Sequence, residues 1–323
     1  MHTHAALKAH LLGLLALASA VAQRPPQPIK APADVAFRTA TIVSEGTRIA
    51  AEVFAPKRAQ GKLPTILMAH GWGGTALGLR PDAICFAKAG YLVVTFDYRG
   101  WGNSDGRLLL EAPSPAGAAG RPFSAMVREV REVIDPIEQT TDWLNALHWL
   151  HGEPRCDQRR IGLWGSSYSG GHVVWVAAHD PRVRAIFSQV GQMDSRFVVT
   201  DPAQRTMTTK QATARSRGEL GYPQPGANVL GNLKGAPIRE RLMHYAPIEH
   251  VSALRQCAAM FVIAEREELF DNRQHGVLAH KLTTGPKRLV TIPEIDHYGI
   301  YGAARARAQS LAIEWFDEHL KQR

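Results

Sequence analysis

The sequence predicts an α/β fold in which a mostly parallel central sheet is covered by helices on both faces. Short apolar runs of strand length alternate with segments of helical periodicity along most of the chain. The composition is that of an ordinary globular protein, with 45% hydrophobic and 21% charged residues in 323 positions, which excludes collagen-like and wholly disordered chains. One stretch, about residues 194–246, breaks the alternation, and we expect it to be an insertion that caps the sheet.

The first 22 residues have the pattern of a secretory signal peptide. Lys8 precedes the apolar run Leu11–Ala22, which is shorter than the roughly 20 apolar residues that a membrane span needs. The run ends in small residues typical of a cleavage site, which predicts cleavage before Gln23. A short buried helix or an uncleaved anchor is the alternative. We therefore expect a secreted or periplasmic protein with one domain over residues 23–323 and no stable membrane insertion.

Four strands are predicted in the first third of the mature chain. Two apolar runs separated by Ser-Glu-Gly-Thr are typical of a β-hairpin, which we expect at one edge of the sheet. The next two runs are apolar throughout, as expected for strands buried on both faces. A helical segment, Pro81–Ala89, lies between the second pair and ends before Gly90. The strands are Val35–Val43, Arg48–Phe54, Thr65–Ala69 and Tyr91–Phe96.

The remainder of the chain continues the alternation. A Gly- and Pro-rich loop covers roughly residues 99–124, and residues 125–150 have helical periodicity, with Pro136 expected to end or kink the first part. The strand Arg160–Trp164 leads into a helix that reaches about Ala178. Three further strands and a final helix complete the fold: Arg184–Gln189, Ala259–Ala264, Arg288–Ile292 and Ala303–Leu320.

Three widely spaced cysteines, Cys85, Cys156 and Cys257, allow at most one disulfide. None is part of a C-x-x-C pair, so the pattern does not favour a zinc or redox site. The first and third lie in apolar surroundings, where we expect them to be small buried hydrophobic residues.

The segment Gly165–Gly171, rich in Gly and Ser, carries the strongest functional signal. It follows a predicted strand and opens a helix, and a serine at such a sharp turn is typical of a nucleophile elbow. With Ser167 at the centre, the positions two before and two after hold the small residues Gly165 and Ser169. Ser169 is a second register, but it lies further from the strand end at Trp164, so Ser167 is preferred. The alternative is a Ser/Gly-rich turn without chemistry.

Nearly all of the mature chain resembles the α/β-hydrolase superfamily in its motifs. Besides the elbow, the resemblance includes His70–Gly74 after the third strand and Asp97–Ser104 after the fourth. The elbow Gly165-x-Ser167-Tyr168-x-Gly170 is similar to that of the cocaine-esterase and Xaa-Pro dipeptidyl-peptidase group. The segments Asp296–Tyr301 and Trp315–Asp317 are more similar to dienelactone-hydrolase-related esterases. This resemblance implies the α/β-hydrolase fold, with Ser, acid and His in that order along the chain.

A serine hydroxyl needs a neighbouring base to act as a nucleophile at neutral pH. His297 lies just past the last predicted strand, where the superfamily has its base. The acid should follow the strand that ends at Ala264, and the resemblance assigns that position to Glu267, although Asp is commoner there. The alternative is that Glu267 is a solvated loop charge. The remaining acids that follow this strand are Glu265, Glu268 and Asp271.

The other histidines after the elbow are expected to have no role in catalysis. Two of them, His172 and His179, fall in the helix after the elbow and are interpreted as structural. His244 and His250 belong to the insertion and its exit. The remaining three lie in helical segments and are expected at the surface: His275, His280 and His319.

Two backbone N–H groups are expected to form an oxyanion hole. One belongs to Tyr168, the residue after the nucleophile, and the other to Trp72, where Gly71 allows a close approach. Both side chains are candidates for the acyl pocket, with ordinary packing as the alternative. Four residues of the insertion are further candidates for the pocket, and packing within the cap is equally compatible with them: Phe197, Met207, Tyr222 and Met243.

Motifs for cofactors, metals and nucleic acids are not found. The segment Gly100–Gly106 follows a strand but lacks the G-x-G-x-x-G spacing and does not open a helix, which excludes a dinucleotide site. No phosphate-binding loop or H-E-x-x-H motif occurs in the sequence, so we expect neither cofactor nor metal. The net charge of +9 and pI near 9.7 raise the question of nucleic acid, but no binding motif supports it. A basic rim for anionic ligands or a solubilising surface are the alternatives.

These observations predict an exported serine hydrolase that cleaves carboxylic esters of small molecules through an acyl-enzyme intermediate. A peptidase or amidase with the same three residues is a second hypothesis, because the elbow serves both reactions. A non-catalytic binding module is a third, because a fold does not fix a function. The sequence leaves the substrate, its chain length and the oligomeric state open.

Overall fold

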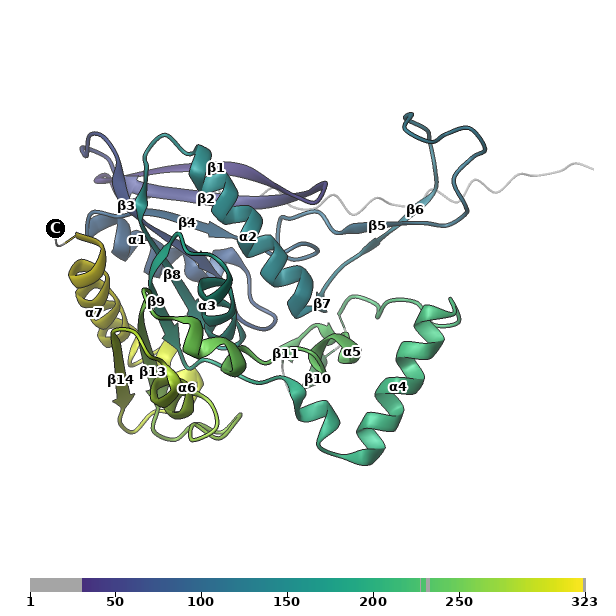
Figure 1. The fold of residues 1–323 in the computed structure, drawn as a ribbon. Helices are drawn as coiled ribbons and strands as arrows, with labels where there is room; N and C mark the ends of the chain where they lie inside the picture. The colour runs from purple at the N-terminus through teal and green to yellow at the C-terminus, as the bar shows by residue number, and fades with distance from the viewer. Residues whose placement is uncertain (1–30, 227, 231–232, 322–323) are drawn as a thin grey trace, which may run out of the picture. The chain divides into compact units, whose positions relative to one another are not determined.

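The centre of the protein is an eight-stranded sheet, seen in Figure 1. The computed structural model describes residues 31–226, 228–230 and 233–321; the predicted signal peptide, residues 1–22, lies outside them. The strand order is β1-β2-β4-β3-β8-β9-β13-β14, with antiparallel pairing of β1 to β2 and of β2 to β4 and parallel pairing elsewhere. The strands are β1 (Val35–Ser44), β2 (Thr47–Pro56), β3 (Leu63–Ala69), β4 (Leu92–Phe96), β8 (Cys156–Ser166), β9 (Val183–Gln189), β13 (Ala258–Ala264) and β14 (Lys287–Ile292).

The sheet confirms the predicted fold class and all eight predicted strands. The hairpin of β1 and β2 closes with Ser44 opposite Thr47. Both turn residues, Glu45 and Gly46, have positive φ, at 48° and 84°, the combination that matches the twist of paired strands in a two-residue turn. The hairpin lies at one edge of the sheet, as expected.

Helices cover both faces of the sheet. Consecutive residues of a strand point to opposite sides, and the central strands are apolar at consecutive positions, so both faces need to be buried. On one side of β8, a Cβ placed on Gly162 would lie 2.7 Å from the ring of Phe316. On the other side, Leu163 belongs to the main core cluster with Leu147 and Val173. The first face carries α1 (Ala76–Lys88) and α7 (Arg305–Phe316), and the second carries α2 (Pro136–Gly152) and α3 (Tyr168–His179).

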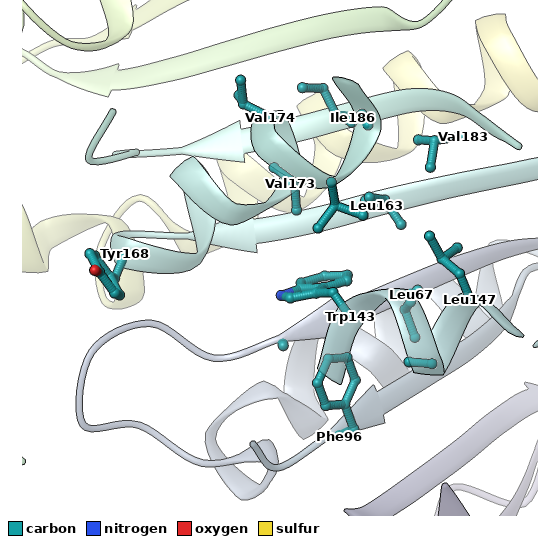
Figure 2. Packing of buried hydrophobic residues seen from close by; sticks show 14 of the residues in the cluster. Leu67, Phe96, Trp143, Leu147, Leu163, Tyr168, Val173, Val174, Val183 and Ile186 are labelled. Atoms are coloured by element: carbon teal, nitrogen blue, oxygen red, sulfur yellow. The ribbon is translucent and has the colours of Figure 1, made fainter. Parts of the chain in front are cut away.

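Figure 2 shows the core between α2, α3 and the sheet. Trp143 and Leu147 of α2 lie next to Leu163 of β8 and Val173 of α3, and all four are fully buried. The indole N–H of Trp143 donates to the hydroxyl of Tyr98 at 2.8 Å, so the largest core side chain is also satisfied as a donor. This packing fixes α3, whose first residue follows the predicted nucleophile.

The helix predicted within residues 125–150 begins later than expected. Its first residue is Pro136, and residues before it form the short strands β6 (Val127–Val130) and β7 (Val133–Ile134). Asp135 caps the helix by accepting hydrogen bonds from the N–H groups of Ile137 and Glu138. A proline at the first helical position costs no hydrogen bond, so Pro136 starts the helix instead of ending it. The prediction was wrong on this point.

Two further boundaries differ from prediction. Helix α1 begins at Ala76, with Pro81 inside it, whereas the sequence placed its start at the proline. The predicted loop at residues 99–124 contains β5 (Arg107–Leu110), which pairs with β6 in a two-stranded ribbon. In Figure 1 this ribbon extends away from the central sheet. The only apolar run of β5 is the three leucines Leu108–Leu110, of which two are exposed, and this run is too short to be distinguished from the surrounding loop.

The stretch between β9 and β13 contains mostly short elements and one long helix. The long helix is α4 (Pro202–Ser216), of whose residues only Thr208 is buried. Strand β12 pairs in parallel with β7 and so joins this stretch to the segment before α2. The short elements are η1 (Arg196–Val199), β10 (Asn228–Leu230), β11 (Leu233–Lys234), β12 (Ala236–Pro237), α5 (Arg239–Leu242) and η2 (Pro247–Ala253).

The C-terminal part contains α6 (Gly276–Leu282), η3 (Tyr298–Tyr301) and the π-helical turn η4 (Asp317–Lys321). In the part of the chain that the structure describes, no helix is both long enough and apolar enough to cross a bilayer. All three cysteines are free thiols. Cys156 and Cys257 are buried and Cys85 is half-buried, so the expectation of a buried residue holds for Cys257 and only partly for Cys85.

Candidate active site

Ser167 occupies the sharp turn between β8 and α3. Its backbone has φ 58° and ψ −123°, a conformation that costs energy for an L-residue and needs support from its surroundings. Support comes from the end of β9 and the residues that follow it, because Ser167 N–H donates to Gln189 O at 2.8 Å and Gln192 N–H donates to Ser167 O at 3.1 Å. A Cβ on Gly165 would lie 2.2 Å from the carbonyl oxygen of Ser169, so this position has to be glycine.

The structure brings the three predicted residues Ser167, His297 and Glu267 into contact. His297 Nε2 lies 3.0 Å from Ser167 Oγ. His297 Nδ1 lies 2.9 Å from each carboxylate oxygen of Glu267. The side chains of His297 and Glu267 are only 2% and 1% exposed. A carboxylate buried beside Nδ1 favours the tautomer that leaves Nε2 able to accept the serine proton.

The other acids after β13 have different partners. Glu268 accepts a hydrogen bond from the backbone N–H of His297 at 2.8 Å. Asp271 is paired with Arg273 at 2.7 Å, and this cation lowers the pKa of its carboxyl. Glu265 accepts from the N–H of Glu294 at 2.8 Å. Of these four acids, Glu267 is the one that meets the imidazole ring.

The loop after β3 lies against the turn that holds Ser167. A Cβ on Gly71 would lie 2.8 Å from Ser166 O and 3.0 Å from Ser167 Cβ, so only a glycine allows this approach. The rings of Trp72 and Tyr168 pack edge to face, with centroids 5.3 Å apart. Neither backbone N–H of this pair donates to a protein group among the described residues, which leaves both donors available to a ligand.

Ser167 lies in the wall of a pocket of about 980 Å³. Most of its lining side chains are aromatic or aliphatic, and a few polar groups interrupt them, as is usual for small-molecule sites. Trp72 is among the lining residues, which supports one of the two readings given for its side chain. The remaining lining residues are Gln192, Asp194, Phe197, Leu233, Glu268, Leu269, Phe270, His275 and Tyr298.

Of the four insertion residues suggested for the pocket, Phe197 lines it. The other three candidates do not line it. Met207 is 42% exposed on α4, and the hydroxyl of Tyr222 accepts a hydrogen bond from Arg107 at 2.6 Å, away from Ser167. Met243 packs against the main core cluster.

Two residues near Ser167 escaped sequence reasoning. His275, expected at the surface, is 8% exposed and lines the pocket. The hydroxyl of Tyr301 lies 2.7 Å from Ser166 Oγ, which also accepts from Gln189 Nε2 at 3.0 Å. Burial raises the pKa of Tyr301 to about 12, so the phenol stays neutral beside the nucleophile turn. Only the proximity of Tyr301 to His297 in the sequence pointed to it.

His172 has the structural role expected for it. It is fully buried beneath Tyr168, with ring centroids 4.7 Å apart. Its two nitrogens contact the hydroxyl of Tyr245 at 2.5 Å and Gln139 Oε1 at 3.1 Å. Burial, helped by nearby His70, lowers the pKa of His172 to about 3, so the ring is neutral at physiological pH.

Comparison with known proteins places this arrangement in a family. Residues 45–213, more than half of the chain, match the family model described as X-Pro dipeptidyl-peptidase (S15 family). An uncharacterized 31.7 kDa protein of the traX-finO intergenic region of Escherichia coli is 29% identical over 287 residues, which are 80% of this chain and 92% of that protein. Thiohydrolase aneE of Aspergillus aculeatus is 30% identical over 168 residues, 50% of this chain and 46% of that protein.

The fold is shared with solved structures of low sequence identity. The α/β hydrolase GrgF from Penicillium sp. sh18 superimposes with a TM-score of 0.69 at 18% identity, covering 89% of this chain and 99% of that one. This likeness and the family match confirm both the predicted superfamily and the predicted similarity of the elbow to the Xaa-Pro dipeptidyl-peptidase group. The chain belongs to the X-Pro dipeptidyl-peptidase (S15) family and is a hydrolase with the α/β-hydrolase fold.

Proposed function

We propose that this protein is an exported serine hydrolase that cleaves carboxylic esters through Ser167, His297 and Glu267. The observation that carries the catalytic part is the continuous contact of carboxylate, imidazole and hydroxyl at 2.9 and 3.0 Å in the wall of a pocket. Such a constellation is recognised by its geometry and by the role of each group.

The reaction has two halves. Ser167 Oγ attacks the ester carbonyl carbon while His297 Nε2 takes its proton, and Glu267 stabilises the imidazolium that forms. The N–H groups of Tyr168 and Trp72 hold the oxyanion of the tetrahedral intermediate. His297 then gives its proton to the leaving alkoxide, and the acyl group stays on Ser167. Water, deprotonated by His297, attacks this acyl-enzyme and releases the carboxylic acid.

The polar groups of the pocket favour an ester over an N-terminal dipeptide. Release of a dipeptide requires a group that binds the substrate ammonium, and an unpaired carboxylate is the usual chemistry for this. Asp194 is already paired with Arg196 at 2.7 Å, and Glu268 accepts from the N–H of His297. The similarity to a thiohydrolase also supports acyl transfer from a non-peptide substrate.

Export and the cap belong to the same proposal. The composition of residues 1–22 supports a cleaved signal peptide, and a mature N-terminus at Gln23 is expected when the secreted or periplasmic protein is analysed by mass spectrometry. An intact N-terminus in that fraction would contradict cleavage. For residues 194–246, the position of Phe197 and Leu233 in the pocket wall supports a cap that shapes the substrate site.

The direct test compares Ser167→Ala with the unchanged protein on a series of p-nitrophenyl esters. We expect kcat/KM to fall by at least about 10³-fold, because the nucleophile is lost. A fluorophosphonate should label the unchanged protein and not the variant. Ser310→Ala is the matched control, since Ser310 is an exposed serine on α7 that donates only to its own helix.

Three results would overturn the proposal. Undiminished ester turnover by Ser167→Ala removes the nucleophile assignment. Persistent fluorophosphonate labelling of that variant does the same. Release of prolyl dipeptides from p-nitroanilides without any ester turnover shows a peptidase instead.

A further inference from the structure

His275 is held in one tautomer by the backbone. The N–H of Met193 donates to His275 Nδ1 at 2.8 Å, and a ring nitrogen that accepts a hydrogen bond carries no proton. A neutral imidazole must then carry its hydrogen on Nε2. Burial lowers the pKa of His275, which also favours this neutral form. Protonation of Nδ1 would turn the short contact with Met193 into a clash of two donors.

The remaining nitrogen of His275 is available to a ligand. His275 lines the same 980 Å³ pocket as Ser167. Within the described residues, Nε2 has no protein hydrogen-bond partner, and it does not belong to the polar atoms enclosed without a partner. Because Nε2 is neither hydrogen-bonded to the protein nor fully buried, and because His275 lines the pocket, we infer that Nε2 faces the pocket.

The backbone also fixes the position of this donor relative to the nucleophile. Gln192 N–H donates to the carbonyl of Ser167, and the next amide, that of Met193, donates to His275. Two consecutive amides therefore anchor Ser167 and the imidazole to one rigid segment. A ligand whose reacting carbonyl is held at Ser167 meets the Nε2–H at a set distance.

The surroundings decide what kind of group this donor accepts. The ring of Phe270 lies 4.5 Å from that of His275, and Trp72, Phe197 and Tyr298 contribute further aromatic surface to the pocket. None of the lining residues is a lysine or an arginine, so an anionic acceptor would meet no cation in the pocket wall. A neutral oxygen on an apolar chain suits all of these neighbours.

We propose that the Nε2–H of His275 is a substrate-recognition donor, and that the preferred substrates are esters with an apolar body and one uncharged acceptor oxygen, such as a ketone or ether, remote from the scissile carbonyl. This inference rests on the proposed esterase function. A purely apolar chain in the pocket leaves the donor without a partner, which disfavours it.

The test uses p-nitrophenyl octanoate and octanoate esters that carry one ketone at each successive position from the fourth carbon outward, together with the matching ketone-bearing octyl acetates. The quantity measured is the ratio of kcat/KM for each ketone ester to that for its plain parent. We expect one position to show a ratio of about five to ten in the unchanged protein, the gain of one hydrogen bond.

Two variants of His275 separate its two nitrogens. In His275→Asn, the amide oxygen keeps an acceptor for Met193 N–H but no donor reaches the pocket, and we expect the ratio to fall to about one. In His275→Gln, the longer amide offers a donor near the place of Nε2, and part of the preference should return. His280→Asn, a substitution within α6, the helix that follows His275, and outside the pocket lining, should leave activity and ratio unchanged.

A second readout does not depend on turnover. Long-range ¹H–¹⁵N NMR of ¹⁵N-histidine protein should show His275 as the Nε2–H tautomer, and an Nδ1–H tautomer overturns the inference. A ratio that His275→Asn does not change, in a variant with a normal melting transition, overturns it as well. If the unchanged protein hydrolyses no ester and resists the fluorophosphonate, the proposed function has failed instead.

Discussion

His297 has a carboxylate on one side of its ring and a serine hydroxyl on the other, and the roles of the two acids that touch this residue differ. Glu267 bonds to the ring nitrogen, whereas Glu268 bonds to the backbone N–H. Only the first contact controls the tautomer and supports a positive imidazolium. Two adjacent acids therefore differ in the part of His297 that they contact, the ring for Glu267 and the backbone for Glu268.

Glu267→Gln should lower kcat by about 10²- to 10⁴-fold, because an amide that donates its proton to Nδ1 selects the wrong imidazole tautomer. The substitution preserves shape, so the melting temperature should change little. Steady-state kinetics with a p-nitrophenyl ester measures the effect. Glu265→Gln, at an acid of the same loop whose carboxylate accepts from Glu294, should keep kcat within about twofold. Equal losses in the two variants would contradict the assignment of the acid.

The buried His172 makes stability depend on pH. Its pKa is about 3 in the folded protein and about 6.5 in an unfolded chain. Between these values the unfolded chain binds a proton that the folded chain does not, so stability is lost as pH falls from about 6.5 toward 3. One such group accounts for up to about 1.4 kcal/mol per pH unit. Burial also lowers the pKa of His70, which adds a loss of the same sign.

His172→Gln should show a weaker dependence of unfolding free energy on pH than the unchanged protein, by about 1 kcal/mol per pH unit between pH 6 and 4.5. Guanidinium unfolding at several pH values measures the slope, which is independent of any loss at neutral pH. His179→Gln, at an exposed histidine of the same helix, serves as control. If the slope is the same in all three proteins, His172 is not the titrating group.

Helix α2 depends on its N-terminal cap more than an exposed helix does. Asp135 caps α2 and is 3% exposed, while Asp201 caps α4 with the same pair of hydrogen bonds at an exposed site. Both helices begin with a proline after the cap. The chain thus contains two caps with the same hydrogen-bond pattern, which differ in burial and in an ion pair of Asp135 with Arg241 at 3.6 Å.

Asp135→Ala should lower the free energy of unfolding by about 1–2 kcal/mol, at the upper end for a cap, because the lost carboxylate is buried and water replaces it poorly as an acceptor. Asp201→Ala should cost about 0.5 kcal/mol, because water replaces the lost oxygen. Urea unfolding followed by circular dichroism gives both values. A larger loss at Asp201 than at Asp135 would show that burial does not set the strength of the cap.

The elements predicted best from the sequence are those whose burial produces a recognisable run of apolar residues in the chain. The strands of the parallel sheet are apolar on both faces, so their runs are visible without knowledge of neighbours. Strand β5 alternates in exposure and was interpreted as loop. Pro136 was interpreted as a helix end, although proline is also favoured at a helix start; Asp135 before it was the overlooked signal.

The site follows the same rule. Ser167 and His297 are marked by local chain features, a glycine-flanked turn and the end of a strand, and the structure brings them together with Glu267. Their catalytic roles stay predictions. His275 has no such mark: its burial results from the segment after β9 and from Phe270 packing around it. Contacts between distant segments of this kind leave no periodic trace in one sequence.

At the scale of the whole molecule, the absence of a side chain at Gly162 determines how closely the C-terminal helix packs against the sheet. Gly162 of β8 lets the ring of Phe316 and the methyl of Leu320 approach to 2.7 and 2.9 Å of where a Cβ would be. Any larger residue has to push the C-terminal helix outward. The close packing of α7 on the sheet therefore depends on glycine at position 162.

Gly162→Ala should destabilise the protein by about 1–3 kcal/mol through this overpacking. Gly78→Ala makes the same chemical change inside α1, where a Cβ would meet no atom within 4 Å, and should be neutral or stabilising by up to about 1 kcal/mol. Thermal unfolding compares the two variants. Destabilisation of equal size in both would mean that the contact with Phe316 is not responsible.

The three unpaired thiols have a consequence for where the chain can fold. None of the three cysteines forms a disulfide, and two of them are buried. The stability of the fold therefore does not depend on forming or keeping a disulfide bond. We therefore expect the same fold in a reducing cytosol and in an oxidising extracytoplasmic space. Residues 31–321 therefore need no disulfide-forming oxidant to fold, and the protein can be produced in a bacterial cytosol.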